Sequence, residues 1–225
     1  MGSWENDLAE RTADLLSTLR NLNQVILAEG KHMLKRNTEQ PRKTIFQTKN
    51  HTIFPTKILA EIIIFVAMAG ALALISHSFF SLPQGGSINL GMVPIFWLAL
   101  RRGPKIGIFA GAVLGVVDLA IEPFVVHPIQ FVLDYPLAFA CLGLAGFFRG
   151  FSRVGPVVGV VIGGVGRFLC HFTSGVVYFV NYTPAGMSPI VYSILYNGSY
   201  MVPSIIICAA VIVLLQKSKT LNIYV

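Results

Sequence analysis

Long apolar runs fill the chain from Lys57 onward, whereas residues 1–56 alternate short apolar and polar stretches. A helix needs about 20 apolar residues, with a rise of about 1.5 Å each, to cross the hydrocarbon core of a bilayer. Glycines, prolines and charge clusters divide the later region into runs of roughly this length. The pattern predicts an all-α membrane protein with six transmembrane helices, at about residues 57–79, 86–101, 104–121, 128–149, 155–181 and 188–215.

Residues 1–56 form a polar arm with a different pattern. Apolar residues recur there at close to helical spacing between about residues 5 and 34, and the polar positions carry charges of both signs. We expect a partly amphipathic helix that is solvated, lies on a surface, or docks to a cytoplasmic partner. The basic run from Lys35 to Lys57 should lie near anionic lipid headgroups. Residues 57–225 are the predicted membrane domain.

Composition and charge agree with this division. The chain is 54% hydrophobic and 12% charged, with a mean hydropathy of +0.69, whereas about 25% of residues are charged in soluble proteins. The net charge of +7 is explained by contact with membrane lipid, so nucleic acid is not needed as a partner. We therefore expect an integral membrane protein.

The short connections between the predicted helices differ in charge, and this difference predicts the orientation. Every second connection contains no Lys or Arg, and positive charges collect on the cytoplasmic side of a membrane. Both termini are therefore predicted to be cytoplasmic, together with the connections that contain Arg101, Arg102, Lys105, Arg149 and Arg153 and the end that contains Lys217 and Lys219.

Motifs for several chemistries are missing from the sequence. There is no GxxxxGK[ST] phosphate loop, no HExxH and no GxSxG. The three cysteines, Cys141, Cys170 and Cys208, stand in apolar stretches without CxxC spacing, which is typical of packing residues. We therefore predict no catalytic residue, no metal and no cofactor, and a protein that is not an enzyme.

Asp134 and Tyr135 interrupt an otherwise apolar segment at residues 131–147. A charge at bilayer depth costs roughly 2.5–3.5 kcal/mol, so such an acid usually faces a cavity and has a partner. One alternative is a structural ion pair with Arg167. We favour the other, in which Asp134 and Tyr135 bind a cationic ligand.

A second polar group lies in the predicted helix at 155–181. Arg167, His171 and Gly175 are spaced i, i+4, i+8 and therefore share one face, with Phe179 about a turn further on. A glycine on this face would let a flat ligand approach the backbone closely. His171 alone would equally suit a satisfied core histidine, and its place on this face favours ligand contact.

The last and first predicted helices supply the remaining candidates. Tyr192 and Asn197 lie in the outer half of the last helix, where a buried amide needs a hydrogen-bond partner. In the first helix, Ala67 with Ala71 gives the small-xxx-small spacing that allows close packing between membrane helices, as do Ala69 and Ala73. Packing within the protein would explain that spacing as well as packing against a partner would.

With these residues assembled, the sequence resembles the thiamin-specific substrate-binding (S) components of energy-coupling factor (ECF) transporters. The resemblance extends from about Thr56 to the C-terminus. It rests on five blocks in the right order: PQGGS at 83–87, MVPIFWLALRRG at 92–103, LDYPLAFACLGLAGFFR at 133–149, HFTSGVVYF at 171–179 and YSILYNG at 192–198.

The resemblance implies six helices in the cell membrane of a prokaryote that enclose one vitamin, thiamin or a close relative, near the outer face. The first external loop would form a lid. Transport would require a separate transmembrane scaffold subunit, contacted by Ala67 and Ala71, and two cytoplasmic ATPase subunits.

Site roles also follow from the resemblance. Asp134 and Tyr135 would hold the aminopyrimidine end, and His171 and Phe179 would flank the thiazolium ring. Polar contacts would come from Tyr192 and Asn197.

Three positions depart from the family pattern. The residue familiar in the family is Trp at the position of Phe179, a carboxylate at that of Asn89, and Lys at that of Arg167. Such changes would alter the affinity or select a thiamin precursor. Two other hypotheses also stay open: an S component for another vitamin such as riboflavin, or a self-contained secondary carrier. A neutral flavin would not require Asp134, and carriers often have internal repeats, of which the sequence shows none.

Overall fold

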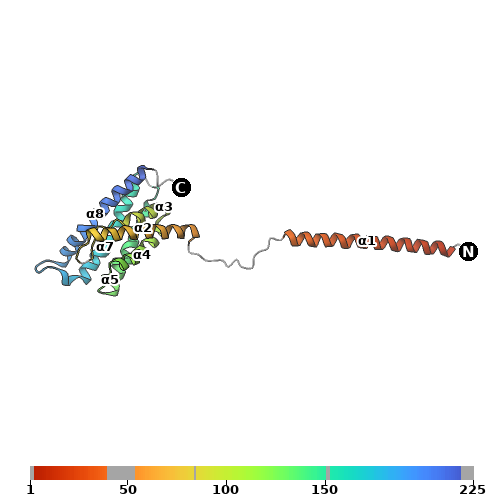
Figure 1. Ribbon diagram of the computed structural model, residues 1–225, viewed down its shortest axis with the longest axis horizontal. Coiled ribbons are helices and arrows are strands. Elements are labelled where there is room, and N and C mark those ends of the chain that lie inside the picture. The colour runs from red at the N-terminus through yellow and green to blue at the C-terminus, as the bar shows by residue number, and fades with distance from the viewer. Residues whose placement is uncertain (1–2, 40–53, 84, 151–152, 219–225) are drawn as a thin grey trace. The chain divides into compact units, whose positions relative to one another are not determined.

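The computed structural model describes residues 3–39, 54–83, 85–150 and 153–218 (Figure 1). The chain divides into two compact units, Met1–Ile53 and Phe54–Val225. In the first unit, α1 (Ser3–Glu39) is a single helix that includes the residues for which a helix was expected. Most of the basic run at 35–57, and Lys219, lie outside the described residues.

The second unit is helical throughout its described part, apart from loops and one isolated antiparallel bridge between Ser81 and Ser87. Its elements are α2 (Thr56–Phe80), α3 (Met92–Arg102), α4 (Pro104–Ile121), α5 (Pro128–Val132), η1 (Leu133–Leu137), α6 (Ala138–Ala140), η2 (Cys141–Phe148), α7 (Gly155–Tyr178), η3 (Val180–Tyr182) and α8 (Pro189–Lys217). Segments α5, η1, α6 and η2 follow one another without a break and form one long helical stretch. Figure 1 shows these helices gathered into one bundle.

Five segments among the described residues are long and apolar enough to cross a membrane: α2, α4, the stretch Pro128–Phe148, α7 and α8. Their bounds agree closely with the predicted ones, and an all-α membrane protein is confirmed. The remaining predicted span, at 86–101, corresponds to α3, which has 11 residues and is about 16 Å long. It is too short to cross a core of about 30 Å by itself, so six spans and the orientation of the termini remain predictions.

Helix α3 begins at Met92, six residues later than predicted, because the preceding residues form a loop. Side chains of neighbouring helices satisfy the backbone of this loop. The amide of Leu90 donates to Ser76 Oγ (3.0 Å), and the amide of Asn89 donates to Ser204 Oγ (3.2 Å). Periodicity alone does not reveal such bonds, because their partners are distant in sequence.

Prolines mark where several helices start. Helices α4, α5, α7 and α8 each have a proline in the first two positions, where its missing N–H would have no helical partner. Between α3 and α4 a single residue, Gly103, makes the turn at φ 93°, a conformation that glycine adopts without strain.

The core surrounds α3, which is buried on nearly all sides. Phe96, Ile95 and Leu98 have no exposed surface, and α3 contacts α2, α4, η2, α7 and α8. A helix that is apolar all round is typically enclosed by other helices. Protein, rather than lipid, therefore covers this short helix.

Glycines bring α4 close to the stretch that bears Asp134. A Cβ at Gly111 would overlap the backbone of Phe139, and one at Gly115 would overlap the backbone of Tyr135. Small residues at such contacts let membrane helices approach closely. This packing fixes the depth and rotation of η1.

Candidate functional site

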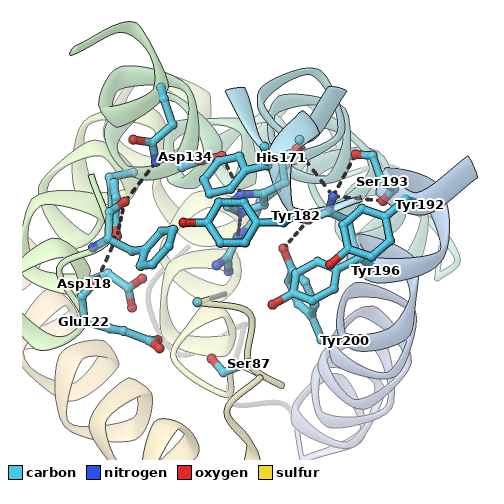
Figure 2. A pocket seen from close by; sticks show the side chains of 18 of the residues that line it. Ser87, Asp118, Glu122, Asp134, His171, Tyr182, Tyr192, Ser193, Tyr196 and Tyr200 are labelled. Atoms are coloured by element: carbon cyan, nitrogen blue, oxygen red, sulfur yellow. Dashed lines mark hydrogen bonds and ion pairs between the residues drawn. The ribbon is translucent and has the colours of Figure 1, made fainter. Parts of the chain in front are cut away.

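A cavity lies where the C-terminal ends of α2, α4 and α7 meet the N-terminal ends of α5 and α8. The cavity is partly open to the outside, and the space between its walls, open solvent included, is about 760 Å³. All eight predicted ligand-binding residues line it: Asp134, Tyr135, Arg167, His171, Gly175, Phe179, Tyr192 and Asn197. Figure 2 shows Asp134 and His171 on one side of the cavity and Tyr192, Tyr196 and Tyr200 on another.

Asp134 is held in place by η1, a single π-helical turn. Pro136 lies inside this turn and has no N–H to continue the α-helical ladder. Such π turns are common at functional sites because they rotate neighbouring side chains. The local sequence DYP therefore explains why a wider turn presents Asp134 and Tyr135 at the cavity.

A hydrogen-bonded network connects Asp134 to Arg167. Ser174 Oγ and Gln130 Nε2 each donate to Asp134 Oδ2 (both 2.7 Å), and His171 Nδ1 lies 3.0 Å from Oδ1. Arg167 Nε donates to His171 Nε2 (3.2 Å). Since Nε2 accepts, a neutral His171 carries its proton on Nδ1 and donates it to Asp134.

This network revises the expected partner of Asp134. The sequence left open a direct ion pair with Arg167, and the structure instead inserts His171 between the two. Arg167 is 4% exposed, and its guanidinium carbon lies 3.8 Å from the centre of the Phe139 ring. A cation over an aromatic face is stabilised by the ring quadrupole.

Tyr135 and Asn197 have hydrogen bonds that position them. The Tyr135 hydroxyl donates to the carbonyl of Glu122 (2.8 Å) and accepts from the amide of Phe124 (2.9 Å). Asn197 Nδ2 donates to the Ser193 carbonyl (2.9 Å), and Asn197 Oδ1 accepts from the Tyr200 hydroxyl (2.6 Å). Both side chains line the cavity. The bonds of Tyr135 join η1 to the loop after α4, whereas these bonds of Asn197 lie within α8.

Aromatic rings form the rest of the wall. Phe179 stacks on Phe124, with ring centroids 5.7 Å apart and an angle of 20° between the ring planes. On α8, the ring centroids of Tyr192 and Tyr196 are also 5.7 Å apart. A Cβ at Gly175 would meet Ser193, so this glycine also makes room for α8. Tyr178, the neighbour of Phe179 in the sequence, stacks on His127.

A second polar group lines the cavity and was not predicted from the sequence. It consists of His77, Asp118 and Glu122. Asn89 stands at the position where the family pattern has a carboxylate. Its Nδ2 donates to Asp118 Oδ1 (3.3 Å). Residues 57–225 contain only four acids, so a count of charges within apolar segments would have identified Asp118 as readily as Asp134.

The alanines of α2 lie on two different faces. Ala67 and Ala71 are exposed and line an apolar groove between α2 and α4, whereas Ala69 and Ala73 are completely buried. The two small-xxx-small pairs therefore have different surroundings, which the spacing alone did not distinguish.

Buried carboxylates beside aromatic rings suit a flat ligand that is cationic and has hydrogen-bond donors. The fold is that of a helical membrane protein, and the cavity has the chemistry to accept a small aromatic molecule. Comparison with known proteins identifies the family. The sequence model of the thiamine transporter protein family (Thia_YuaJ) matches residues 59–223, and the chain belongs to this family.

Individual relatives agree. The chain is 42% identical to thiamine transporter ThiT of Bacillus subtilis (strain 168) over 170 residues, which cover 70% of the chain and 88% of the relative. ThiT of Lacticaseibacillus paracasei is 32% identical over 171 residues, or 69% and 84% of the two chains. A solved structure of ThiT from Listeria monocytogenes matches with a TM-score of 0.65 at 29% identity, covering 73% of this chain and 95% of that one.

The predicted resemblance to thiamin-specific proteins is therefore confirmed. The relatives are named transporters, and the described chain has five apolar helices of membrane-spanning length. The chain is a multi-pass membrane protein of a thiamine transporter family.

Proposed function

We propose that the protein binds thiamin in this cavity, at the outer face of the cell membrane, as the substrate-binding S component of an ECF vitamin importer. Membership of the thiamine transporter family supports the ligand. The single observation that carries the proposal is the Asp134, His171 and Arg167 network beside the Phe179 ring in one cavity.

Each part of thiamin has a complement among these residues. The 4-aminopyrimidine is a hydrogen-bond donor, and Asp134 with Tyr135 would hold it. The thiazolium is a flat cation, and His171 and Phe179 would flank it because an aromatic face attracts a cation. Tyr192 would add a polar contact.

The proposed assembly has further subunits. In this proposal ATP is hydrolysed by two separate ATPase subunits, and the exposed face of Ala67 and Ala71 contacts the transmembrane scaffold. The groove lined by these alanines is apolar and open, which suits a partner helix. Both termini and the arm of residues 1–56 would be cytoplasmic, as the charge of the connections predicts.

Calorimetry on the detergent-purified protein tests the ligand. We expect heat from thiamin and none from riboflavin, which is neutral. Asp134→Asn should weaken thiamin binding by about 1.5–3 kcal/mol, the scale of a hydrogen bond to a charged group. Absence of heat with thiamin, its phosphates and its pyrimidine precursor would refute the proposal.

Uptake into liposomes separates the S component from a self-contained carrier. The protein alone should bind thiamin without moving it across the bilayer. Accumulation of thiamin in liposomes that contain only this protein would favour the carrier instead.

A further inference from the structure

Three of the four acids in residues 57–225 line the cavity, and the function proposed above uses only Asp134. The other two, Asp118 and Glu122, lie at the end of α4, where Figure 2 shows them together on one side of the cavity. His77, at the end of α2, lies between them. Its Nε2 is 3.7 Å from Asp118 Oδ1, and its Nδ1 contacts Glu122 Oε2.

These groups are shielded but reachable from the cavity. The side chains of Asp118 and His77 are 9% and 12% exposed, and that of Glu122 is 29% exposed. Among the residues that the structure describes, no cluster of His, Cys, Asp and Glu has the arrangement of a metal site. Carboxylates are acceptors, so Asp118 and Glu122 can accept hydrogen bonds from a donor in the cavity.

Arg167 provides a second, independent observation. Its guanidinium is fixed by His171 and by the Phe139 ring, is almost fully buried and lines the same cavity. Within the described part of the chain, Nη1 has no hydrogen-bond partner. A buried donor without an acceptor is costly, so an acceptor on the ligand is expected there.

A donor and acceptors in one cavity complement an alcohol. A hydroxyl group accepts one hydrogen bond through its oxygen and donates one through its proton. A phosphate ester has only acceptors at this position and about −1.5 to −2 charges at pH 7. The three carboxylates outnumber Arg167 and His77 together, so the cavity would repel such a phosphate.

We infer that Asp118 and Glu122, with Arg167, recognise the free alcohol end of the ligand and discriminate against its phosphate ester. The inference rests on the proposed function, because thiamin has a hydroxyethyl group at the end away from its aminopyrimidine. Arg167 Nη1 donates to the hydroxyl oxygen, and the hydroxyl proton goes to one of the carboxylates.

Calorimetry with thiamin and thiamin monophosphate on the full-length protein tests this. The unmodified protein should bind thiamin at least tenfold more tightly than the ester. The ratio of the thiamin affinity to the ester affinity should fall at least tenfold when Asp118→Asn is combined with Glu122→Gln. In this double variant thiamin should bind more weakly, and the ester should bind equally or more tightly. Glu61→Gln, which removes a carboxylate at the other end of α2, is the matched control and should leave the ratio unchanged.

The outcomes separate the inference from the proposed function. If the unmodified protein binds thiamin but the ratio is equal in the variants, or both ligands weaken alike, the cluster only joins α2 to α4 and the inference is wrong. If the unmodified protein does not bind thiamin, the proposed function fails and the inference fails with it. If the double variant does not fold, the single variant Glu122→Gln is tested instead. It must lower the ratio of the thiamin affinity to the ester affinity at least threefold.

Discussion

The two ends of the Phe54–Val225 unit deal with polar groups in opposite ways. At the end where α2 begins and α3 finishes, the charges pair with one another: Glu61 accepts from Arg102 Nε (2.6 Å) and from Arg101 Nη2 (3.2 Å). At the other end, carboxylates and amides are drawn inward around a cavity. The first end can close into a packed core, whereas the second must satisfy each buried polar atom or leave it for a ligand.

This contrast separates stability from binding. Packing is the main source of association between membrane helices, and the fully buried side chains of α3 concentrate it away from the cavity. Near the cavity, the hydrogen bonds of Asp134 and Asn197 replace part of that packing. Core substitutions should therefore change unfolding, and cavity substitutions should change binding.

The largest effect is expected in the core. Phe96 has no exposed surface and packs against Gly163 of α7. Phe96→Ala should lower the free energy of unfolding by about 3–5 kcal/mol, because it leaves a cavity among rigid neighbours. SDS-induced unfolding in mixed micelles measures this loss.

Phe147→Ala is the matched control, since Phe147 is 60% exposed. It should change the free energy of unfolding by less than about 0.5 kcal/mol. Equal losses in the two variants would contradict the view that the packed core around α3 provides the stability.

The sequence predicts the fold well wherever one segment contains its own signals. Apolar length, together with prolines such as Pro104 and Pro189, locates the long helices to within a few residues. The predicted start of α3 was wrong because the hydroxyls of Ser76 and Ser204 accept hydrogen bonds from backbone amides of the loop before it. Such bonds depend on the tertiary structure, which periodicity does not record.

A moderate effect on binding is expected at Phe179. Phe179→Leu removes the aromatic face but keeps an apolar side chain, and should weaken thiamin binding by about 0.5–2 kcal/mol. Phe179→Tyr should retain most of the affinity because it keeps the ring. Calorimetry measures both, and neither should change the unfolding transition.

Phe172→Leu is the control for this pair. Phe172 stacks on Phe168 with centroids 6.2 Å apart and is not among the residues that line the cavity. Thiamin affinity should be unchanged in this variant. Equal affinity in Phe179→Leu and the unmodified protein would show that no cation lies against Phe179.

The candidate site was only partly predictable. Helical spacing placed Arg167 and His171 on one face, and a lone acid in an apolar run pointed to Asp134. Glu122 was not predicted because it lies just beyond a span, where charges are common at the membrane surface. Asp118 lies within the span and could have been identified by the same reasoning as Asp134. The convergence of Asp118 and Glu122 with His77 arises from the packing of α2 against α4, which a single sequence does not specify.

The smallest effect on the isolated protein is expected on the exposed face of α2. Ala71 lines the groove between α2 and α4 and is not among the residues that line the cavity. Ala71→Trp should leave thiamin affinity and unfolding unchanged, yet abolish thiamin uptake by cells that depend on this protein, because bulk there blocks a partner helix. Ala73→Trp is the control: Ala73 is completely buried, so overpacking should destabilise the isolated protein by about 1–3 kcal/mol. Lost binding in purified Ala71→Trp would show that this face packs internally, and normal uptake would show that it faces only lipid.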